Sequence, residues 1–205
     1  MITIVDYGLG NLGSIQNMFK HIGVKARIES DVDKIKSASK ILLPGIGSFD
    51  TAMEKINKKG LKEVLHEKAI KEQIPVLGIC LGMQLLTSSS EEGHLSGLGW
   101  IPGKTLTYKN QINKKIKIPH MGWNLVSKSS ESELTQGFED FEEVRFYFVH
   151  SYFVKVANEK NSILKTSYGV EFDSAIQKDN IYGAQFHPEK SHKFGMKIFK
   201  NFASI

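Results

Sequence analysis

The first half of the sequence alternates short apolar runs with amphipathic helical patterns, and this rhythm limits the fold more than any other feature. Apolar runs with the length of buried strands occupy residues 2–5, 24–28, 41–43 and 75–79. Between them, apolar residues recur at three-to-four spacing at residues 12–22 and 61–70, as on one face of a helix. Strands that alternate with helices in this way form a mainly parallel sheet with helices on both faces. The sequence therefore predicts an α/β fold.

The second half has a different pattern. Shorter apolar runs that alternate with polar residues lie at residues 114–118, 145–149 and 152–156. They predict antiparallel strands attached to the parallel core. A last strand is expected at residues 181–186 and a closing helix at residues 195–202. Because the sequence contains no internal repeat, low-complexity tract or linker, we expect residues 1–205 to form one domain.

Composition and charge narrow the class of protein. The chain has 205 residues, 40% hydrophobic and 24% charged, which is ordinary for a globular protein and unlike a disordered or fibrous one. Its net charge of +5 is scattered, and the nearest approach to a cluster is Lys114, Lys115 and Lys117, which alternate with isoleucines. A nucleic-acid site needs a clustered positive surface, so we do not expect one.

The single cysteine bears on the cellular setting. It excludes an internal disulfide, and the sequence opens with a strand-like run rather than a secretory signal. No apolar stretch approaches the roughly 18 residues that span a bilayer, so no membrane partner is expected. These features predict a reducing, cytoplasmic setting. In that setting a lone thiol is either a small buried hydrophobic group or a reactive one.

The glycine-rich stretch at residues 8–13 matches the G-x-G-x-x-G pattern of dinucleotide-binding folds. It lies between the first predicted strand and helix, and Glu29 lies near the end of the second strand, where such folds place a ribose-binding carboxylate. The alternative is a turn that needs glycine for its backbone angles and binds nothing. The choice depends on whether the rest of the chain is organised around another site.

A second glycine pattern, Gly-Ile-Cys-Leu-Gly at residues 78–82, lies between an apolar strand and a helical run. It matches a nucleophile elbow, whose sharp turn presents the central side chain at the carboxyl end of a strand. The helix N-terminus attracts negative charge on Cys80, and the N–H of Leu81 can donate to an oxyanion. Cys80 is therefore the predicted nucleophile. The alternative is an inert buried cysteine at a tight turn.

The segment Gln-Phe-His-Pro-Glu at residues 185–189 supplies the base that a cysteine nucleophile needs. It follows the last predicted core strand, so His187 is expected at the same sheet edge as Cys80. Glu189, two residues on, lies on the same side as His187 if the segment is extended. A carboxylate there can hold the imidazole in the tautomer that accepts the thiol proton. The sequence thus predicts a Cys80–His187–Glu189 triad.

These two motifs resemble those of the triad-type (class I) glutamine amidotransferases. More narrowly, the chain resembles the glutaminase subunits of imidazole glycerol phosphate synthase from end to end. Further shared segments lie at residues 6–11, 43–47, 119–124 and 146–152. The cysteine and histidine motifs mark the superfamily, whereas residues 119–124 and 146–152 mark the subfamily. In this family the opening motif belongs to the scaffold, which implies that residues 8–13 bind no nucleotide.

The resemblance implies roles for further residues. An oxyanion site would be formed by the backbone of Leu81 and of Gly45, Ile46 and Gly47. Glutamine would be held by Gln84, Glu92, Ser151 and Tyr152. A partner protein would contact Trp123, Asn124 and Lys190. The resemblance implies neither a metal nor a cofactor.

The resemblance also implies the reaction. Glutamine would be hydrolysed to glutamate and ammonia, and the ammonia would pass to a (β/α)8 barrel cyclase in a heterodimer. The cyclase would form imidazole glycerol phosphate, for histidine biosynthesis, together with AICAR. Free ammonia would become ammonium at neutral pH and lose its nucleophilicity, so a sheltered route to the partner is expected.

Three alternatives stay open. A paralogous glutaminase group supplies ammonia for amidino-modified surface sugars of lipopolysaccharide or flagellar glycan, and Gly13 and residues 190–195 favour it. A stand-alone cysteine hydrolase would act without a partner. A dinucleotide-binding module at residues 8–13 would bind NAD and be indifferent to loss of Cys80.

Overall fold

The computed structural model of the chain describes residues 1–110 and 116–205. Its strands are β1 Ile2–Val5, β2 Ala26–Glu29, β3 Ile41–Leu43, β4 Val76–Ile79, β5 Ser89–Ser90, β6 Gly103–Thr107, β7 His120–Leu125, β8 Ser127–Lys128, β9 Arg145–His150, β10 Tyr152–Val156, β11 Ser162–Tyr168, β12 Val170–Lys178 and β13 Ile181–Ala184. Its α-helices are α1 Leu12–His21, α2 Val32–Lys36, α3 Phe49–Lys58, α4 Leu61–His66, α5 Leu81–Leu85 and α6 His192–Ser204.

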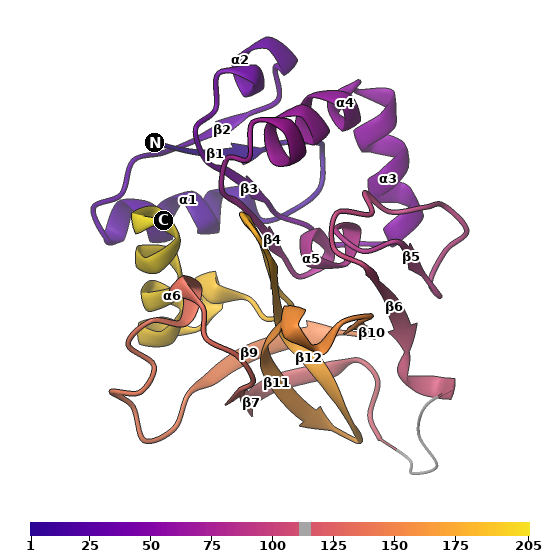
Figure 1. The fold of residues 1–205 in the computed structure, drawn as a ribbon, viewed down its shortest axis with the longest axis vertical. Helices are drawn as coiled ribbons and strands as arrows, with labels where there is room; N and C mark the ends of the chain where they lie inside the picture. The colour runs from indigo at the N-terminus through magenta and orange to yellow at the C-terminus, as the bar shows by residue number, and fades with distance from the viewer. Residues whose placement is uncertain (111–115) are drawn as a thin grey trace.

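The described strands form one large sheet and one separate pair (Figure 1). The large sheet has the order β2-β1-β3-β4-β13-β12-β10-β6-β5, with β11 beside β12 and β8 beside β11. Strands β2, β1, β3, β4 and β13 are parallel to one another. Strands β12, β10 and β6 continue the sheet in antiparallel order, and β7 pairs with β9. The predicted parallel sheet with an antiparallel extension is confirmed.

Helices cover both faces of the parallel strands, as predicted (Figure 1). Alternation along each strand separates the two apolar cores. Ile4 and Leu77 pack on the face covered by α1 and α6, where Phe19 and Phe199 lie with ring centroids 4.4 Å apart. Val76 packs on the opposite face with residues of α2, α3 and α4. Burial on both faces explains why β1, β3, β4 and β13 are almost continuously apolar in sequence, whereas the half-buried edge strand β2 is not.

The antiparallel extension has an aromatic core. Phe146 and Phe148 of β9 point inward, and Phe146 stacks on Phe186 with centroids 3.7 Å apart. Phe172 of β12 meets Phe148 edge-on. The pair β7–β9 is therefore attached to the end of β13 through aromatic packing. No helix in the two described ranges is long and apolar enough to cross a membrane.

Several element predictions differ from the structure. Helices α2 and α3 were not predicted, and the helix expected at residues 61–70 ends its α-helical part at His66 and continues as a π-helical turn, Glu67–Lys71. Of the strand expected at residues 114–118, Lys114 and Lys115 lie outside the described residues, and residues 116–118 are not in a strand.

Candidate functional site

Cys80 lies in the tight turn between β4 and α5. Its φ is 53° and its ψ is −109°, a backbone conformation that a side chain disfavours. The turn is held by the bond from Cys80 N–H to the Ala184 carbonyl, at 2.7 Å. A Cβ on Gly78 would lie 2.6 Å from the Gly82 oxygen, and a Cβ on Gly82 would lie 1.9 Å from the Leu43 oxygen. Both glycines are therefore needed for space.

His187 follows β13, which runs parallel to β4, so it emerges at the same sheet edge as Cys80. Its Nδ1 lies 2.7 Å from Oε1 of Glu189, and both side chains are almost fully buried. The backbone is fixed as well, because His187 N–H donates to the Tyr147 carbonyl at 2.9 Å and Ser191 Oγ donates to the His187 carbonyl at 2.6 Å. Nε2 of His187 has no hydrogen-bond partner among the described atoms.

The charge state of His187 depends on its two neighbours. Burial alone would lower the pKa of His187, but Cys80 and Glu189 outweigh burial and raise that pKa to about 10. The nearby Cys80 side chain is one of the raising causes, beside the hydrogen bond and charge attraction to Glu189. The imidazole is thus placed between a thiol that can give it a proton and a carboxylate that stabilises the resulting cation.

A cavity of about 320 Å³ opens beside Cys80 and is lined by both Cys80 and His187. Seven other residues predicted to bind substrate or stabilise an oxyanion also line it: Ile46, Gly47, Leu81, Gln84, Glu92, Ser151 and Tyr152. Glu189 and Gly45 are not part of the lining; Glu189 binds His187 from behind. The structure therefore gathers residues from distant parts of the sequence around one space.

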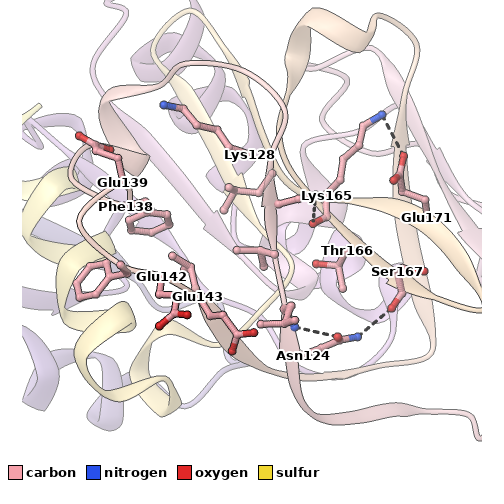
Figure 2. A pocket seen from close by; sticks show the side chains of 16 residues that line it. Asn124, Lys128, Phe138, Glu139, Glu142, Glu143, Lys165, Thr166, Ser167 and Glu171 are labelled. Carbon is pink, nitrogen blue, oxygen red and sulfur yellow. Dashed lines mark hydrogen bonds and ion pairs between the residues drawn. The ribbon is translucent and has the colours of Figure 1, made fainter.

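A second and larger cavity, of about 580 Å³, lies between β7, β11 and the segment before β9 (Figure 2). Its lining includes the acidic residues Glu139, Glu142, Glu143 and Glu171, and Figure 2 shows Lys165 directed toward Glu171. None of the three predicted catalytic residues lines it. Cavity volume alone therefore does not select a candidate site, whereas the arrangement of reactive groups favours the cavity at Cys80.

The predicted oxyanion segment, residues 44–47, follows β3. Tyr7 donates its hydroxyl to the Pro44 carbonyl at 2.6 Å, and a Cβ on Gly45 would lie 2.7 Å from the same hydroxyl oxygen. Burial raises the pKa of Tyr7, so the hydroxyl keeps its proton as a donor. Gly47 has φ 104°, a region that only glycine enters without strain. Tyr7 was not predicted as a site residue; it immediately precedes the glycine-rich stretch at residues 8–13 that matched the dinucleotide pattern.

Residues of α5 and β10 form two walls of the cavity at Cys80. Leu81 is the first residue of α5, so its N–H has no acceptor within the helix. The Gln84 amide donates to the Tyr152 carbonyl at 3.1 Å and to Oε1 of Gln185 at 3.2 Å. Ser151 adjoins Tyr152 in the lining. Gln185 was not predicted as a site residue, although it stands in the same motif as His187.

Two carboxylates, those of Glu92 and Asp50, connect the loop that carries Glu92 to the start of α3. Oε2 of Glu92 accepts from the Phe49 N–H at 2.8 Å. Burial raises the pKa of Glu92, and the Phe49 bond opposes that rise. The Asp50 carboxylate in turn accepts from the N–H groups of His94 and Leu95 at 2.9 and 3.0 Å. The start of α3, just after the oxyanion segment, is thus tied to the loop that carries Glu92.

The predicted partner-facing residues do not share one face of β7. Trp123 is 45% exposed and lies on the same side as Met121 and Leu125, which are 61% and 48% exposed. Asn124 lies on the other side because successive residues of a strand alternate. Its amide donates to the Ser167 carbonyl at 3.1 Å, as Figure 2 shows.

Lys190 is exposed at the edge of the Trp123 side of the strand pair. Its Nζ lies 5.5 Å from the centroid of the Tyr147 ring, and Tyr147 is paired with Trp123 across the two strands. The Trp123 ring stacks on His192, with centroids 5.6 Å apart. Lys190 and Trp123 therefore belong to one continuous surface.

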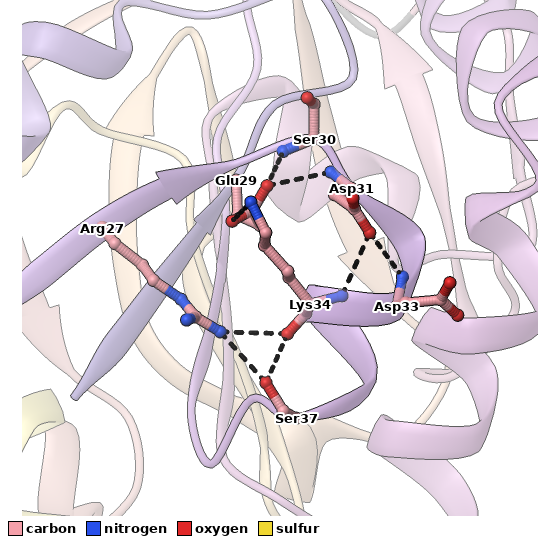
Figure 3. A network of polar contacts seen from close by, with 7 residues as sticks. All are labelled: Arg27, Glu29, Ser30, Asp31, Asp33, Lys34 and Ser37. Atoms are coloured by element: carbon pink, nitrogen blue, oxygen red, sulfur yellow. Dashed lines mark hydrogen bonds and ion pairs between the residues drawn. The ribbon is translucent and has the colours of Figure 1, made fainter.

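The groups that a dinucleotide fold would offer to its ligand are engaged within the protein. Oε1 of Glu29 accepts from the N–H groups of Ser30 and Asp31, each at 3.0 Å, at the start of α2 (Figure 3). Asn11 caps the N-terminus of α1 by accepting from the Ser14 N–H. The ribose carboxylate and the phosphate-binding helix end thus both have protein partners. In the described ranges, no three His, Cys, Asp or Glu side chains are grouped as metal ligands.

Comparisons with known proteins identify the family of the chain. The family model of class-I glutamine amidotransferases matches residues 3–205. The chain is 54% identical over 202 residues to the imidazole glycerol phosphate synthase subunit HisH 2 of Methanococcus maripaludis, covering 98% of each protein. It is 46% identical over 206 residues to the HisH subunit of Bdellovibrio bacteriovorus, covering 100% of each.

Solved structures share the fold at low sequence identity. A glutamine amidotransferase crystal structure gives a TM-score of 0.74 at 13% identity, covering 100% of both chains. PurLQS from Thermotoga maritima gives 0.72 at 18% identity, covering 99% of this chain and 97% of the other. The chain therefore belongs to the class-I glutamine amidotransferase family, and its full-length relatives include HisH subunits of imidazole glycerol phosphate synthase.

Proposed function

We propose that the chain hydrolyses glutamine to glutamate and ammonia through Cys80, His187 and Glu189, with residues 1–205 acting as one glutamine amidotransferase domain. The observation that carries the proposal is the 2.7 Å bond from His187 Nδ1 to Glu189 at a cavity lined by Cys80. A cysteine nucleophile, an imidazole base and a carboxylate that orients the base are the parts such a reaction needs.

In the proposed reaction, the Cys80 thiolate attacks the side-chain amide carbon of glutamine. The carbonyl oxygen becomes an oxyanion that accepts from the Leu81 N–H and from an N–H of residues 45–47 after that segment rearranges. One such donor is typically worth about 3–4 kcal/mol. His187 gives its proton to the departing ammonia and leaves a thioester on Cys80. It then takes a proton from water, which releases glutamate and restores the thiol.

The cavity offers groups of the right kind for both ends of glutamine. Glu92 and Gln84 hold its polar groups, and the backbone of Ser151 and Tyr152 binds the α-carboxylate. Two contacts support this assignment, since Glu92 is fixed by Phe49 and Gln84 is fixed by Tyr152. A volume of about 320 Å³ lies at the small end of ligand pockets, as a single amino acid requires.

The ammonia passes to a (β/α)8 barrel cyclase that forms imidazole glycerol phosphate and AICAR. The names of the relatives support a partner, because they describe subunits of imidazole glycerol phosphate synthase. The exposed side of β7, with Met121, Trp123 and Leu125, is an apolar surface of the kind that binds another protein. Lys190 lies at its edge and supplies a charge for the rim. Asn124 acts from behind this surface.

The test is glutamate release from glutamine by the full chain, alone and with the barrel subunit and its nucleotide ligand from the same source. Wild type is compared with Cys80→Ala and with the nearly isosteric Cys80→Ser. We expect little turnover alone, strong turnover in the complex, and none with either variant. Full activity of Cys80→Ala would refute the proposal. Full activity of the wild type without any partner would favour a stand-alone hydrolase.

A second destination for the ammonia is the synthesis of amidino-modified surface sugars. Gly13 and residues 190–195 favour it in sequence, and the fold does not require glycine at position 13, because no described atom outside its own neighbourhood lies within 4 Å of where its Cβ would be. Activation by a barrel subunit encoded beside sugar-modification genes, and not by one encoded beside histidine genes, would establish this alternative. The glutaminase chemistry is the same in both.

A further inference from the structure

A chain of hydrogen bonds leads inward from the buried side of β7. Nδ2 of Asn124 lies 3.2 Å from Nε2 of His120, and Nδ1 of His120 lies 3.0 Å from Nε2 of His150. Nδ1 of His150 lies 2.8 Å from the carbonyl oxygen of Tyr152, which lines the cavity at Cys80. We call Asn124, His120 and His150 the histidine relay.

The position of every proton in the histidine relay follows from the contact between His150 and the Tyr152 carbonyl. A carbonyl oxygen only accepts, so Nδ1 of His150 must carry a proton and donate to Tyr152. Nε2 of a neutral His150 is then an acceptor, so Nδ1 of His120 must carry the proton that joins the two rings. Nε2 of His120 is left as an acceptor, and its neighbour Asn124 must donate to it.

The Asn124 end of the histidine relay independently requires the same proton positions. The orientation of the Asn124 amide is fixed, because its Nδ2 also faces the Ser167 carbonyl and its Oδ1 accepts from the Leu125 N–H at 2.8 Å. Nδ2 must therefore be the donor toward His120. Both ends require the same two neutral Nδ1–H tautomers, and every bond in the histidine relay points toward Tyr152.

A second pair of side chains continues from the Tyr152 carbonyl to the nucleophile. One N–H of Gln84 donates to Tyr152 and the other to Oε1 of Gln185. Nε2 of Gln185 then donates to Sγ of Cys80 at 3.8 Å. We call Gln84 and Gln185 the glutamine bridge. Rotating the Gln84 amide would set its oxygen against two acceptors, and rotating the Gln185 amide would set two donors against each other, so these orientations are fixed as well.

The surroundings keep the two histidines neutral. The His120 ring is stacked between Phe148 and Tyr168, with centroids 4.8 and 3.9 Å away. Burial lowers the pKa of His120 to about 4 and that of His150 to about 3. The titratable groups near the pair are Tyr168 beside His120 and Tyr108 and His187 near His150. None of these is a carboxylate that would favour a cation.

We propose that the histidine relay is a positioning device for the active site. It fixes the Tyr152 carbonyl at the wall of the substrate cavity and, through the glutamine bridge, orients the Cys80 thiol. Because Asn124 lies directly behind the exposed side of β7, the histidine relay also joins the proposed partner surface to the nucleophile. Its effect on turnover rests on the proposed function, whereas its tautomers do not.

The first test measures the tautomers in the isolated full chain. With ¹⁵N-labelled histidine, long-range ¹H–¹⁵N spectra distinguish Nδ1–H, Nε2–H and cationic rings. Of the seven histidines, we expect two to keep the neutral Nδ1–H pattern from pH 8 down to pH 5.5. His120→Phe should remove one of them and so assign it. If His120 or His150 shows an Nε2–H ring or titrates near pH 6.5, the proposal is wrong.

The second test separates hydrogen bonding from packing in the active complex. His120→Phe keeps an aromatic ring in the stack but removes the donor to His150, and the unpaired buried acceptor should raise KM for glutamine about tenfold and lower kcat by a smaller factor. His120→Asn, which offers an N–H near the Nδ1 position, should restore most of the loss. Tyr168→Phe, which stacks on the same ring without joining the relay, is the control and should behave as wild type.

The experiments distinguish failure of the histidine relay from failure of the proposed function. Wild-type KM in His120→Phe, or an equal defect in His120→Asn, overturns the positioning role. An absence of glutaminase activity in the wild-type complex would sink the proposed function, and the tautomer spectra would still decide on the histidine relay, because they need no turnover.

Discussion

Two glycine-rich turns lie where parallel strands end at the same edge of the sheet, residues 8–13 after β1 and residues 78–82 at the end of β4. They look alike in sequence but use glycine for different physical reasons. In the first turn, Gly8 and Gly10 have φ values of 93° and 118°, so glycine supplies a backbone conformation. In the second turn, both glycines have ordinary backbone angles and are required because neighbouring backbone occupies the space of a Cβ.

The difference shows that a glycine pattern specifies a backbone shape, while its chemical use depends on the side chain that the turn presents. The second turn presents Cys80 to a cavity. The first turn is directly preceded by the buried Tyr7, whose hydroxyl supports the Pro44 carbonyl, and Asn11 of the turn caps α1. The stretch that matched a dinucleotide site therefore takes part in the structure behind the proposed oxyanion segment.

The largest effect is expected from Gly82→Ala. The new Cβ would lie 1.9 Å from the Leu43 oxygen, which is backbone and cannot move aside cheaply. We expect the free energy of unfolding to fall by more than about 3 kcal/mol, together with loss of glutaminase activity. Urea denaturation measures the change. A loss below about 1 kcal/mol would show that the space around Gly82 does not require glycine.

A large effect on activity is expected from Glu189→Gln. The amide keeps the size of the side chain but removes the charge that helps to raise the pKa of His187 to about 10. We expect kcat to fall about 100-fold or more. The alkaline limit of activity and the His187 pKa, measured by NMR, should both move to lower pH. An unchanged His187 pKa would mean that Glu189 acts only through shape.

Glu189→Gln should also change how the stability of the protein depends on pH. The folded pKa of His187 lies above the ordinary value near 6.5, so its protonation stabilises the fold fully below about pH 6.5. That stabilisation is lost as the pH rises through about 10. The difference in unfolding free energy between wild type and Glu189→Gln should therefore be largest at or below neutral pH and shrink toward pH 10. A difference that grows with pH would contradict this assignment.

Tyr7→Phe tests the role given to the first turn. Removing the hydroxyl leaves the Pro44 carbonyl without its donor, which should cost about 1–2 kcal/mol of unfolding free energy. If Tyr7 supports the oxyanion segment, kcat should fall about tenfold while KM changes little. Tyr182→Phe is a matched control, because it also removes a buried hydroxyl contact, to Glu133, away from the cavity at Cys80. Equal kcat losses in both variants would remove the special role of Tyr7.

The sequence could predict those parts of the candidate site whose residues lie close together along the chain. The elbow around Cys80 and the His187–Glu189 pair are each encoded within a few residues, and the parallel order of β4 and β13 brings them to one edge. Helix α3 had a usable signal that was missed, since Phe49, Ala52, Met53 and Ile56 follow helical spacing. The more consequential omissions were contacts between distant segments.

Asp50, Gln185 and the histidine relay show why those contacts could not be predicted. Each depends on a partner far along the chain, such as Asp50 with the His94 N–H or His120 with His150. A single sequence encodes the residue types but not the register that brings them together. Asn124 illustrates the same limit, because only the pairing of β7 with β9 establishes which of its neighbours are exposed.

The smallest effect is expected from Gly13→Ala, and it distinguishes the two turns most directly. Gly13 lies in the first turn of α1 with an ordinary backbone angle and open space where a Cβ would be. Alanine favours helix over glycine, so we expect the free energy of unfolding to rise by about 0.5 kcal/mol, with kcat and KM unchanged. In a dinucleotide fold the third glycine permits close packing of helix and strand, and alanine would be tolerated less well. Urea denaturation and a titration with NAD test this together. A stabilised variant, with no NAD binding before or after the change, assigns residues 8–13 to the scaffold. NAD binding that Gly13→Ala weakens would instead restore the dinucleotide interpretation.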